Sequence, residues 1–409
     1  MSSAPNSLLR DGWLLQLCVA RAFMMFIYMT YAAALPLLRV EWDMSGTAAG
    51  SVATSAQLAY AGSLMLFSWL ADRIGARRVF MLSGVATAVA AMTFALFARS
   101  YLSCLILYSL VSLASGGTYT TMIMLFADRY RPERRGAAVG WFIASGSLGY
   151  AISLALTGLA LPVGGYPLAF LLTASGAVVG LAVAWVALRG TPNVVHARHE
   201  GHAFGAEVLK NRETMLLIGG YTAHSWELLG MWAWAPAFLA ASFALSGSQA
   251  LESVQLGAYS AAAFNVMGLV ASSSMGRLSD DLGRRTVLIA CAGVSAVCSF
   301  AWGWMVAWPA AAVLLVGAIY SFCALGDSPV LSTAVTETVK PAYLGAALAL
   351  RSLLGFGAGA IAPLVFGAIL DATNPARATA TAWGWPFVAL GVGGLIATLC
   401  AWRLPQTRA

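Results

Sequence analysis

Four ionisable side chains interrupt long apolar stretches of this 409-residue sequence: Arg21, Glu227, Asp327 and Arg351. Each stretch is long enough to cross a lipid bilayer, which takes about 20 mainly apolar residues. At about 1.5 Å of rise per residue, Arg21, Asp327 and Arg351 fall near the bilayer middle, and Glu227 lies somewhat further out. A charge at that depth is costly unless it pairs or faces water, so these residues are the first functional candidates.

The residue types point to a particular chemistry. An arginine guanidinium holds a carboxylate through two parallel hydrogen bonds and stays charged at any working pH. Carboxyl groups gain and lose protons when their surroundings change. We therefore predict that Arg21 and Arg351 bind the carboxylate of a small organic anion. We also predict that Glu227 or Asp327 carries a coupling proton.

Neighbours on the same helical faces extend this prediction. Tyr28 follows Arg21 by about two turns, and His224 and Trp234 share a face with Glu227. A histidine can also change its protonation near neutral pH. We expect Tyr28, His224 and Trp234 to contact the substrate.

A static arrangement of the four charges is the alternative. Asp327 would then pair with Arg351 within one half of the chain, and Arg21 would pair with Glu227. Such ion pairs would neutralise one another and bind no solute.

The rest of the sequence describes the elements that must position these residues. Only 10% of the residues are charged and 60% are hydrophobic, whereas soluble proteins carry about a quarter charged residues. An all-α membrane protein with twelve transmembrane helices explains this composition. The apolar runs assigned to these helices are 13–36, 47–70, 79–98, 102–127, 137–160, 166–188, 214–240, 253–275, 286–306, 309–336, 342–369 and 381–403.

Lysine and arginine are distributed unevenly between the two sides of these runs. With the N-terminus in the cytoplasm, 18 lie on the cytoplasmic side, 3 lie on the other side, and Arg21 and Arg351 lie inside runs. Such a bias sets the orientation of a membrane protein. It also accounts for the net charge of +7 without any nucleic-acid partner. We predict a multi-pass protein of the cell inner membrane with both termini in the cytoplasm.

The two halves of the sequence repeat each other. The sequence DRIG at 72–75 and the sequence DDLG at 280–283 lie 208 residues apart, and the same offset matches Tyr119 to Asp327. Tyr119, which lies in a hydroxyl-rich stretch, is therefore a further candidate substrate contact. Two parallel six-helix repeats explain this offset. The predicted domains are an N-terminal six-helix bundle at 1–190, a cytoplasmic linker at 191–212 and a C-terminal six-helix bundle at 213–409.

One motif connects the sequence to a known family. Residues 276–285 read GRLSDDLGRR, and residues 68–78 read SWLADRIGARR. The first matches the G-x-x-x-D-[RD]-x-G-R-[RK] pattern of major facilitator proteins completely, whereas the second has Ser68 in place of Gly and an inserted Ala76. The loop 131–136, RPERRG, is also similar to that superfamily. The whole chain thus resembles major facilitator secondary transporters, and among them bacterial organic-anion and metabolite carriers.

This resemblance implies a fold, a passage and a gate. The fold would be two pseudo-symmetric six-helix bundles working by alternating access, with helices 1, 4, 7 and 10 lining the passage. The motif's glycine permits a tight turn, and its aspartate can pair with arginine or cap a helix. The alternative is that the arginines only set topology. The residues that would clasp the two halves shut on the cytoplasmic side are Asp72, Arg73, Arg77, Asp280 and Arg284.

We therefore predict a secondary active transporter, not an enzyme, that moves a small organic anion across the cytoplasmic membrane with protons. Drug–proton antiport is the alternative, but such exporters usually carry a proline-containing signature on helix 5 that residues 140–149 lack. Soft-metal (copper) uptake is a minor alternative, suggested by methionines such as Met24 and Met25.

No metal site and no cofactor are predicted. His196, His199 and His202 have helical spacing, yet a solvated linker face explains them better, because no carboxylate or cysteine set completes a metal shell. The expected partners are a small anionic solute, protons and the lipid bilayer. Nucleic acid is not expected, and the resemblance implies a monomer.

Overall fold

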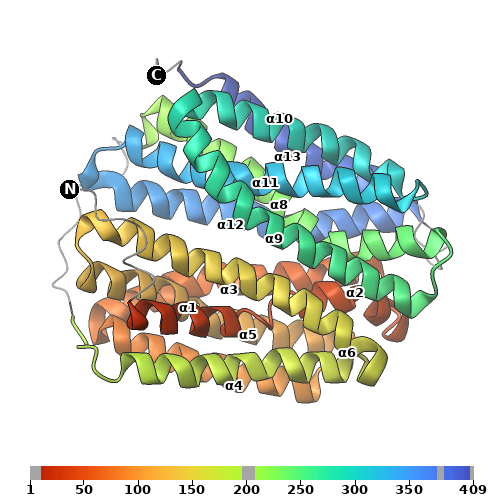
Figure 1. The fold of residues 1–409 in the computed structure, drawn as a ribbon, viewed down its shortest axis with the longest axis horizontal. Helices are drawn as coiled ribbons and strands as arrows, with labels where there is room; N and C mark the ends of the chain where they lie inside the picture. Colours follow the sequence, from red (N-terminus) through yellow and green to blue (C-terminus); the bar gives the residue numbers. More distant parts are fainter. Residues whose placement is uncertain (1–10, 196–207, 375–381, 406–409) are drawn as a thin grey trace. The chain divides into compact units, whose positions relative to one another are not determined.

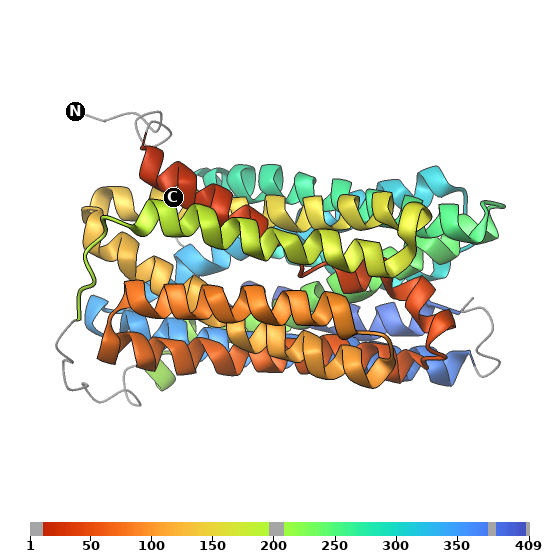
Figure 2. The same cartoon turned by 90° about the horizontal axis from the view of Figure 1, so that it is seen from below.

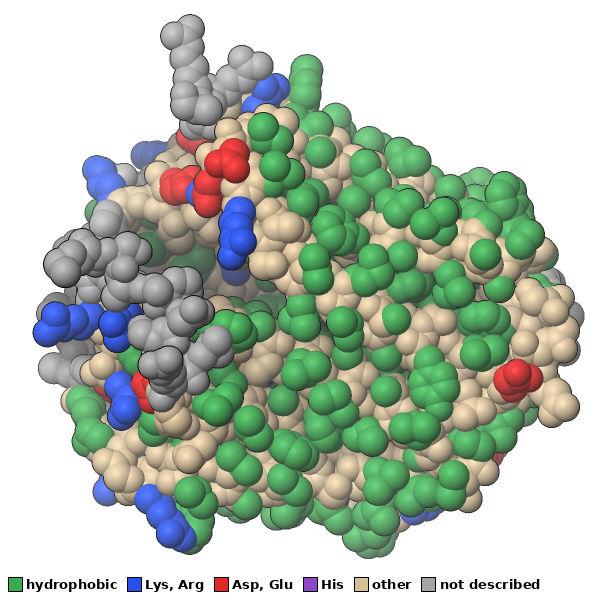
Figure 3. Space-filling view, viewed as in Figure 1, with side chains coloured by type: hydrophobic (Ala, Val, Ile, Leu, Met, Phe, Trp, Pro, Cys, Tyr) green, Lys and Arg blue, Asp and Glu red, His purple; other side chains and the backbone are tan. Residues whose placement is uncertain are grey.

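The computed structural model describes residues 11–195, 208–374 and 382–405, and all regular elements in these ranges are helical. Apolar side chains cover much of the visible surface, and most Lys and Arg side chains lie near one end of the helices (Figure 3). The helices (Figure 1) are α1 (Gly12–Met24), α2 (Thr30–Glu41), α3 (Gly46–Ile74), α4 (Ala76–Phe97), α5 (Tyr101–Arg129), α6 (Pro132–Leu188), α8 (Arg212–Leu245), α9 (Ala250–Leu282), α10 (Arg284–Trp302), η2 (Gly303–Met305), α11 (Ala310–Thr338), α12 (Pro341–Thr373) and α13 (Gly384–Trp402).

These helices confirm the predicted all-α membrane fold with twelve spans. Nine of the described helices are long and apolar enough to cross a membrane by themselves. One of them, α6, contains two predicted spans, because Gly164 and Gly165 leave the helical conformation between them, with φ +63° at Gly165. Only glycine adopts such a backbone without strain, so the chain turns here.

The first predicted span is not one continuous helix, and that expectation was wrong. Helix α1 ends at Met24 and α2 begins at Thr30, with turns between them. The side chain of Ser153 in α6 donates to the carbonyl of Phe26, and the hydroxyl of Tyr108 in α5 donates to the carbonyl of Tyr28 at 2.5 Å. Non-helical backbone at membrane depth is tolerated when neighbouring side chains satisfy it in this way.

The described residues divide into two compact units. Unit 1 comprises those in 1–34 and 55–198, and unit 2 comprises those in 35–54 and 199–409. Within each unit the helices run side by side, as Figure 2 shows from a second direction. The division at 191–212 stays a prediction, and most of that linker lies outside the described residues, including His196, His199 and His202.

The repeat seen in the sequence recurs in the backbone. Gly75, between α3 and α4, has φ 91° and ψ 145°, and Gly283, between α9 and α10, has φ 84° and ψ 145°. Both values lie in a region that favours glycine. The two copies of the motif therefore make the same sharp turn at equivalent places.

Glycines bring α6 against the backbone of α1 beside Arg21. A Cβ atom on Gly149 would overlap the carbonyl oxygen of Ala22, and one on Gly180 would lie 2.7 Å from that of Ala20. Small residues at a membrane-helix contact allow this close approach. The packing sets where the Arg21 side chain leaves α1.

Candidate functional site

Arg21 in unit 1 is a buried cation without an acidic partner in the described residues. Arg21 is only 8% exposed, and its Nε and Nη1 atoms have no hydrogen-bond partner among the described atoms. The hydroxyl of Tyr60 in α3 hydrogen-bonds to the guanidinium. Gly146 leaves room for the side chain, since a Cβ there would lie 3.3 Å from Nε. Because a buried unpaired charge is costly, this geometry favours an anion from outside the chain.

Aromatic rings surround this guanidinium. Its carbon lies 5.4 Å from the ring centre of Tyr119 and 5.1 Å from that of Phe142, within cation–π range. The ring of Tyr28 meets those of Tyr60 and Tyr150 edge-on, with centres 6.3 and 6.2 Å apart. We call this set, Arg21 with Tyr28, Tyr60, Tyr119, Phe142 and Tyr150, the arginine site.

The break between α1 and α2 adjoins the arginine site. Tyr28 lies in the break, where its hydroxyl donates to the Ser115 side chain of α5. Interrupted helices at membrane depth are a frequent feature of transporter binding sites. Of the residues named from the sequence, Arg21, Tyr28 and Tyr119 are thus brought together. Tyr60, Tyr150 and Phe142 were missed, because no short-range spacing connects them to Arg21.

Unit 2 holds a second group of buried ionisable residues, His224, Glu227 and Asp327, which we call the acid cluster. His224 Nδ1 lies 3.0 Å from Asp327 Oδ1, and its Nε2 lies 2.8 Å from the hydroxyl of Ser328. All three members of the cluster are almost fully buried. The imidazole therefore lies between a carboxyl group, which it approaches without a hydrogen bond of good geometry, and a hydroxyl group to which it is hydrogen-bonded.

Glu227 belongs to the same unit, and no cationic side chain of the described residues lies beside it. Its residue is 2% exposed, and its Oε1 has no hydrogen-bond partner among the described atoms. Ser295 and Tyr320 lie next to it, but the Tyr320 hydroxyl already donates to Ser299 at 3.0 Å. Proton uptake is the simplest way to neutralise such a carboxyl group.

Arg351 does not form the static pair that the sequence offered as an alternative. Asp327 pairs with His224, whereas Arg351 donates to the Ser332 hydroxyl at 2.8 Å and lies 4.1 Å from the ring centre of Tyr221. Its Nε atom has no hydrogen-bond partner among the described atoms. The two side chains thus have different neighbours, His224 for Asp327 and Ser332 with Tyr221 for Arg351.

Trp234 lies in the aromatic core of unit 2. Its residue is 1% exposed, its indole N–H donates to the carbonyl of Pro363 at 3.0 Å, and its ring stacks on Phe366. A fully packed ring with a satisfied N–H contributes to core stability. We therefore assign Trp234 to the core of unit 2 and not to a binding site.

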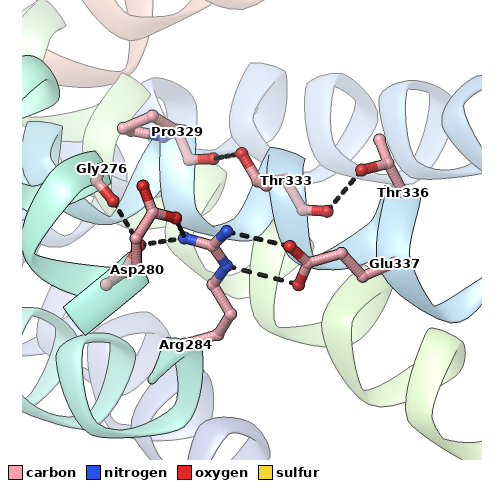
Figure 4. A network of polar contacts seen from close by, with 8 residues as sticks. Gly276, Asp280, Arg284, Pro329, Thr333, Thr336 and Glu337 are labelled. Carbon is pink, nitrogen blue, oxygen red and sulfur yellow. Dashed lines mark hydrogen bonds and ion pairs between the residues drawn. The ribbon is translucent and has the colours of Figure 1, made fainter. Parts of the chain in front are cut away.

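The motif residues of unit 2 form a compact ion network (Figure 4). Arg284 contacts Asp280 at 2.6 Å and Glu337 at 2.9 Å, and it also donates to Ser279. Glu337 lies in the last turn of α11. It fastens the α9–α10 turn to α11.

The first copy of the motif makes different contacts. Arg73 stacks over Trp69 at 3.7 Å, and Arg77 donates to the carbonyl of Arg189 at 3.3 Å. Asp72 is exposed. The clasp between halves that the resemblance implied for these residues stays a prediction.

In the described part of the chain, no group of three or more His, Cys, Asp or Glu side chains is arranged to hold a metal ion.

Comparison with known proteins gives the family. The model of the Major Facilitator Superfamily matches residues 17–273 and 236–409. This chain belongs to that superfamily. It is therefore a multi-pass membrane protein and, like the other members of the superfamily, a transporter.

Three solved structures are similar to this chain in fold. They are a D-xylose–proton symporter (TM-score 0.76, 17% identity, 97% of this chain and 98% of that chain), a bacterial homolog of the human lysosomal transporter Spinster in an inward-facing, occupied conformation (0.77, 15%, 100% and 98%), and the nucleoside transporter NupG (0.72, 14%, 97% and 100%).

One curated relative is similar in sequence. It is the Bacillus subtilis (strain 168) protein NiaP, whose name assigns it to niacin/nicotinamide transport. The two are 27% identical over 144 residues, which is 35% of this chain and 36% of the relative. The match thus spans about a third of the relative's length.

Proposed function

We propose that this transporter carries a small organic anion with a carboxylate group, bound at the arginine site. The observation that carries the proposal is the buried Arg21 guanidinium, with two nitrogens that lack partners among the described atoms. A carboxylate would accept a hydrogen bond from one of these nitrogens and neutralise the charge. The name of the relative covers niacin, a small carboxylic acid, and nicotinamide, its neutral amide, so it supports the carboxylate class through niacin alone.

The acid cluster supplies the proposed proton coupling. Glu227 is the proton carrier in this proposal, because no cation of the described residues lies beside it to compensate a negative charge. Asp327, by contrast, lies 3.0 Å from His224, so a neighbouring side chain already contacts its carboxyl group. A carboxyl group inside the membrane that binds and releases protons is a common element of proton-coupled carriers.

The proposal includes a cellular setting. The chain spans the inner membrane as a monomer with both termini in the cytoplasm, and the motif residues Asp72, Arg73, Arg77, Asp280 and Arg284 act as the cytoplasmic gate. The contacts of Arg77 with the carbonyl of Arg189, and of Arg284 with Asp280 and Glu337, support this role for those residues, because they hold the turns at one end of each unit.

A thermal-stability panel on the purified full-length protein tests the substrate class. We expect nicotinate and similar carboxylates to raise the melting temperature by several degrees, since a ligand at a hundred times its Kd stabilises by about 2.7 kcal/mol. Nicotinamide, the matched neutral amide, should stabilise far less. Stabilisation by tetraphenylphosphonium alone would favour the drug-export alternative, and stabilisation by cuprous ion alone would favour copper uptake.

A further inference from the structure

The arginine site offers one cation and a wall of aromatic rings. Five rings belong to it, from Tyr28, Tyr60, Tyr119, Phe142 and Tyr150, and they come from helices α3, α5 and α6 and from the break between α1 and α2. All four tyrosines are half-buried, whereas Phe142 is fully buried. Tyr119, Phe142 and Tyr60 contact the guanidinium directly, and Tyr28 and Tyr150 extend the ring cluster from Tyr60.

Such a wall discriminates between ligands of the same charge. Aromatic rings prefer edge-on or offset contacts with other rings, and each such pair contributes about 0.5–1.5 kcal/mol beyond the area it buries. A saturated ring of the same size buries similar area but lacks the quadrupole that these contacts use. A planar aromatic ligand therefore gains an advantage that an aliphatic one does not.

We propose that the arginine site selects an aromatic monocarboxylate, with its carboxylate on Arg21 and its ring packed against the cluster of Tyr28, Tyr60 and Tyr150. This inference rests on the proposed function and narrows it. It makes Tyr60 and Tyr150 residues that determine specificity. Tyr119 and Phe142 then hold the guanidinium in place through their cation–π contacts.

Three matched compounds test the proposal by calorimetric binding to the full-length protein: benzoate, cyclohexanecarboxylate and benzamide. We expect benzoate to bind roughly tenfold or more tightly than cyclohexanecarboxylate, as one or two ring pairs would provide. Benzamide, which has the ring but no charge, should bind more weakly still. Equal binding of benzoate and cyclohexanecarboxylate would overturn the ring selection and leave the carboxylate proposal standing. Absence of binding by both acids would instead overturn the proposed function.

Two variants at one position separate the ring from its hydroxyl group. Tyr150→Leu should remove most of the preference for benzoate, whereas Tyr150→Phe should retain it, because the ring remains. Tyr101→Leu, at the first residue of α5 and outside the site, serves as the control. If Tyr150→Leu fails to fold, loss of the preference in Tyr150→Phe would still contradict the proposal.

A separate observation concerns the hairpin formed by residues 35–54, which belongs to unit 2 although α2 and α3 both continue into unit 1. Asp371, near the end of α12, accepts hydrogen bonds from the backbone N–H groups of Gly46 and Thr47 at 2.6 and 2.8 Å. It also accepts one from the Thr47 hydroxyl at 2.7 Å. A carboxylate at a helix N-terminus satisfies free N–H groups and complements the helix dipole.

The backbones of α3 and α12 touch just beyond this contact. A Cβ atom on Gly46 would lie 2.6 Å from the carbonyl oxygen of Gly367, and one on Gly50 would overlap that of Pro363. Few side-chain atoms interlock where backbones meet in this way. The carboxylate of Asp371 supplies three hydrogen bonds between the hairpin and α12, and Arg39 of the hairpin lies close enough to interact with it electrostatically.

We infer that Asp371 holds the hairpin 35–54 against α12, and that the hairpin separates from α12 as a unit when these hydrogen bonds break. The topology predicted from the sequence puts the hairpin on the outer side of the membrane. Opening there would be a step of the transport cycle that does not depend on which solute is carried.

Hydrogen–deuterium exchange of the full-length protein tests this role of Asp371 without any ligand. Asp371→Asn should speed exchange in peptides covering 35–54 roughly tenfold, because one charge-assisted contact is lost, while the rest of unit 2 keeps its protection. Thr47→Val, which removes only the hydroxyl, should have a smaller effect. Glu252→Gln, at an exposed acid on α9, is the control. Unchanged exchange in 35–54, or an equal rise throughout unit 2, would overturn the inference.

Discussion

Arg21→Gln should abolish carboxylate binding and transport while leaving the empty protein at least as stable as before. Truncating one member of a buried, hydrogen-bonded charge pair costs about 2–5 kcal/mol, which is roughly a 30-fold to 3000-fold loss of affinity. The empty wild-type protein, by contrast, carries the cost of a buried guanidinium with two unpartnered nitrogens among its described atoms. Removing that charge removes the penalty. The measurements are ligand affinity and melting temperature on the same preparation.

Two further variants show whether the loss of binding comes from the charge and the planar geometry of Arg21. Arg21→Lys keeps the charge but loses the planar fork, so its affinity should fall between those of the wild type and Arg21→Gln. Arg99→Gln is the matched control in unit 1, since Arg99 already donates to the carbonyls of Ala95 and Ala98 and should not contribute to binding. A strong loss of stability in Arg21→Gln without ligand would mean that Arg21 is a structural residue and would contradict the site.

Glu227→Gln should uncouple transport from protons. A gradient of one pH unit supplies about 1.4 kcal/mol for each proton, enough for about tenfold accumulation of a solute. In proteoliposomes the variant should lose this accumulation and keep solute exchange between the two sides, because exchange needs no net proton movement. The measurement is uptake of labelled nicotinate with and without an imposed gradient.

Asp327→Asn and His224→Gln distinguish the members of the acid cluster. If Glu227 carries the proton, these variants should alter the rate of uptake and retain accumulation. Glu252→Gln is the control for loss of an acid elsewhere in unit 2. Full accumulation by Glu227→Gln would transfer the coupling role to the His224–Asp327 pair. Wild-type uptake that ignores the gradient would exclude proton coupling altogether.

Much of the architecture could be predicted from the sequence, because its causes are local. A run of about 20 apolar residues specifies a spanning helix wherever it occurs. The turns at Gly75 and Gly283 follow from glycine's access to positive φ, and the bend of α6 coincides with Gly164 and Gly165. The break after Met24 has no such signal, since residues 25–29 contain neither glycine nor proline. It depends on Ser153 and Tyr108, which are far away in the sequence.

The candidate sites were less predictable from the sequence, because many of their contacts join residues that are far apart in it. The cost of charge in a membrane identified Arg21, Glu227 and Asp327, and helical spacing added Tyr28 and His224. Spacing is silent about contacts between helices, and so the sequence suggested Asp327–Arg351 as a pair where the structure has Asp327–His224. Tyr60 and Tyr150 approach Tyr28 only through tertiary packing.

The interruption between α1 and α2 has a mechanical consequence. Tyr28 is part of the arginine site, and a few residues later the same chain enters the hairpin held by Asp371. Its backbone is tied laterally by Tyr108 and Ser153, but it lacks the rigid rod that a continuous helix would provide. The residues between α1 and α2 are therefore the covalent link between the proposed binding site and the hairpin. If a solute displaces the Tyr28 ring, we expect the resulting backbone change to reach the hairpin without bending a continuous helix.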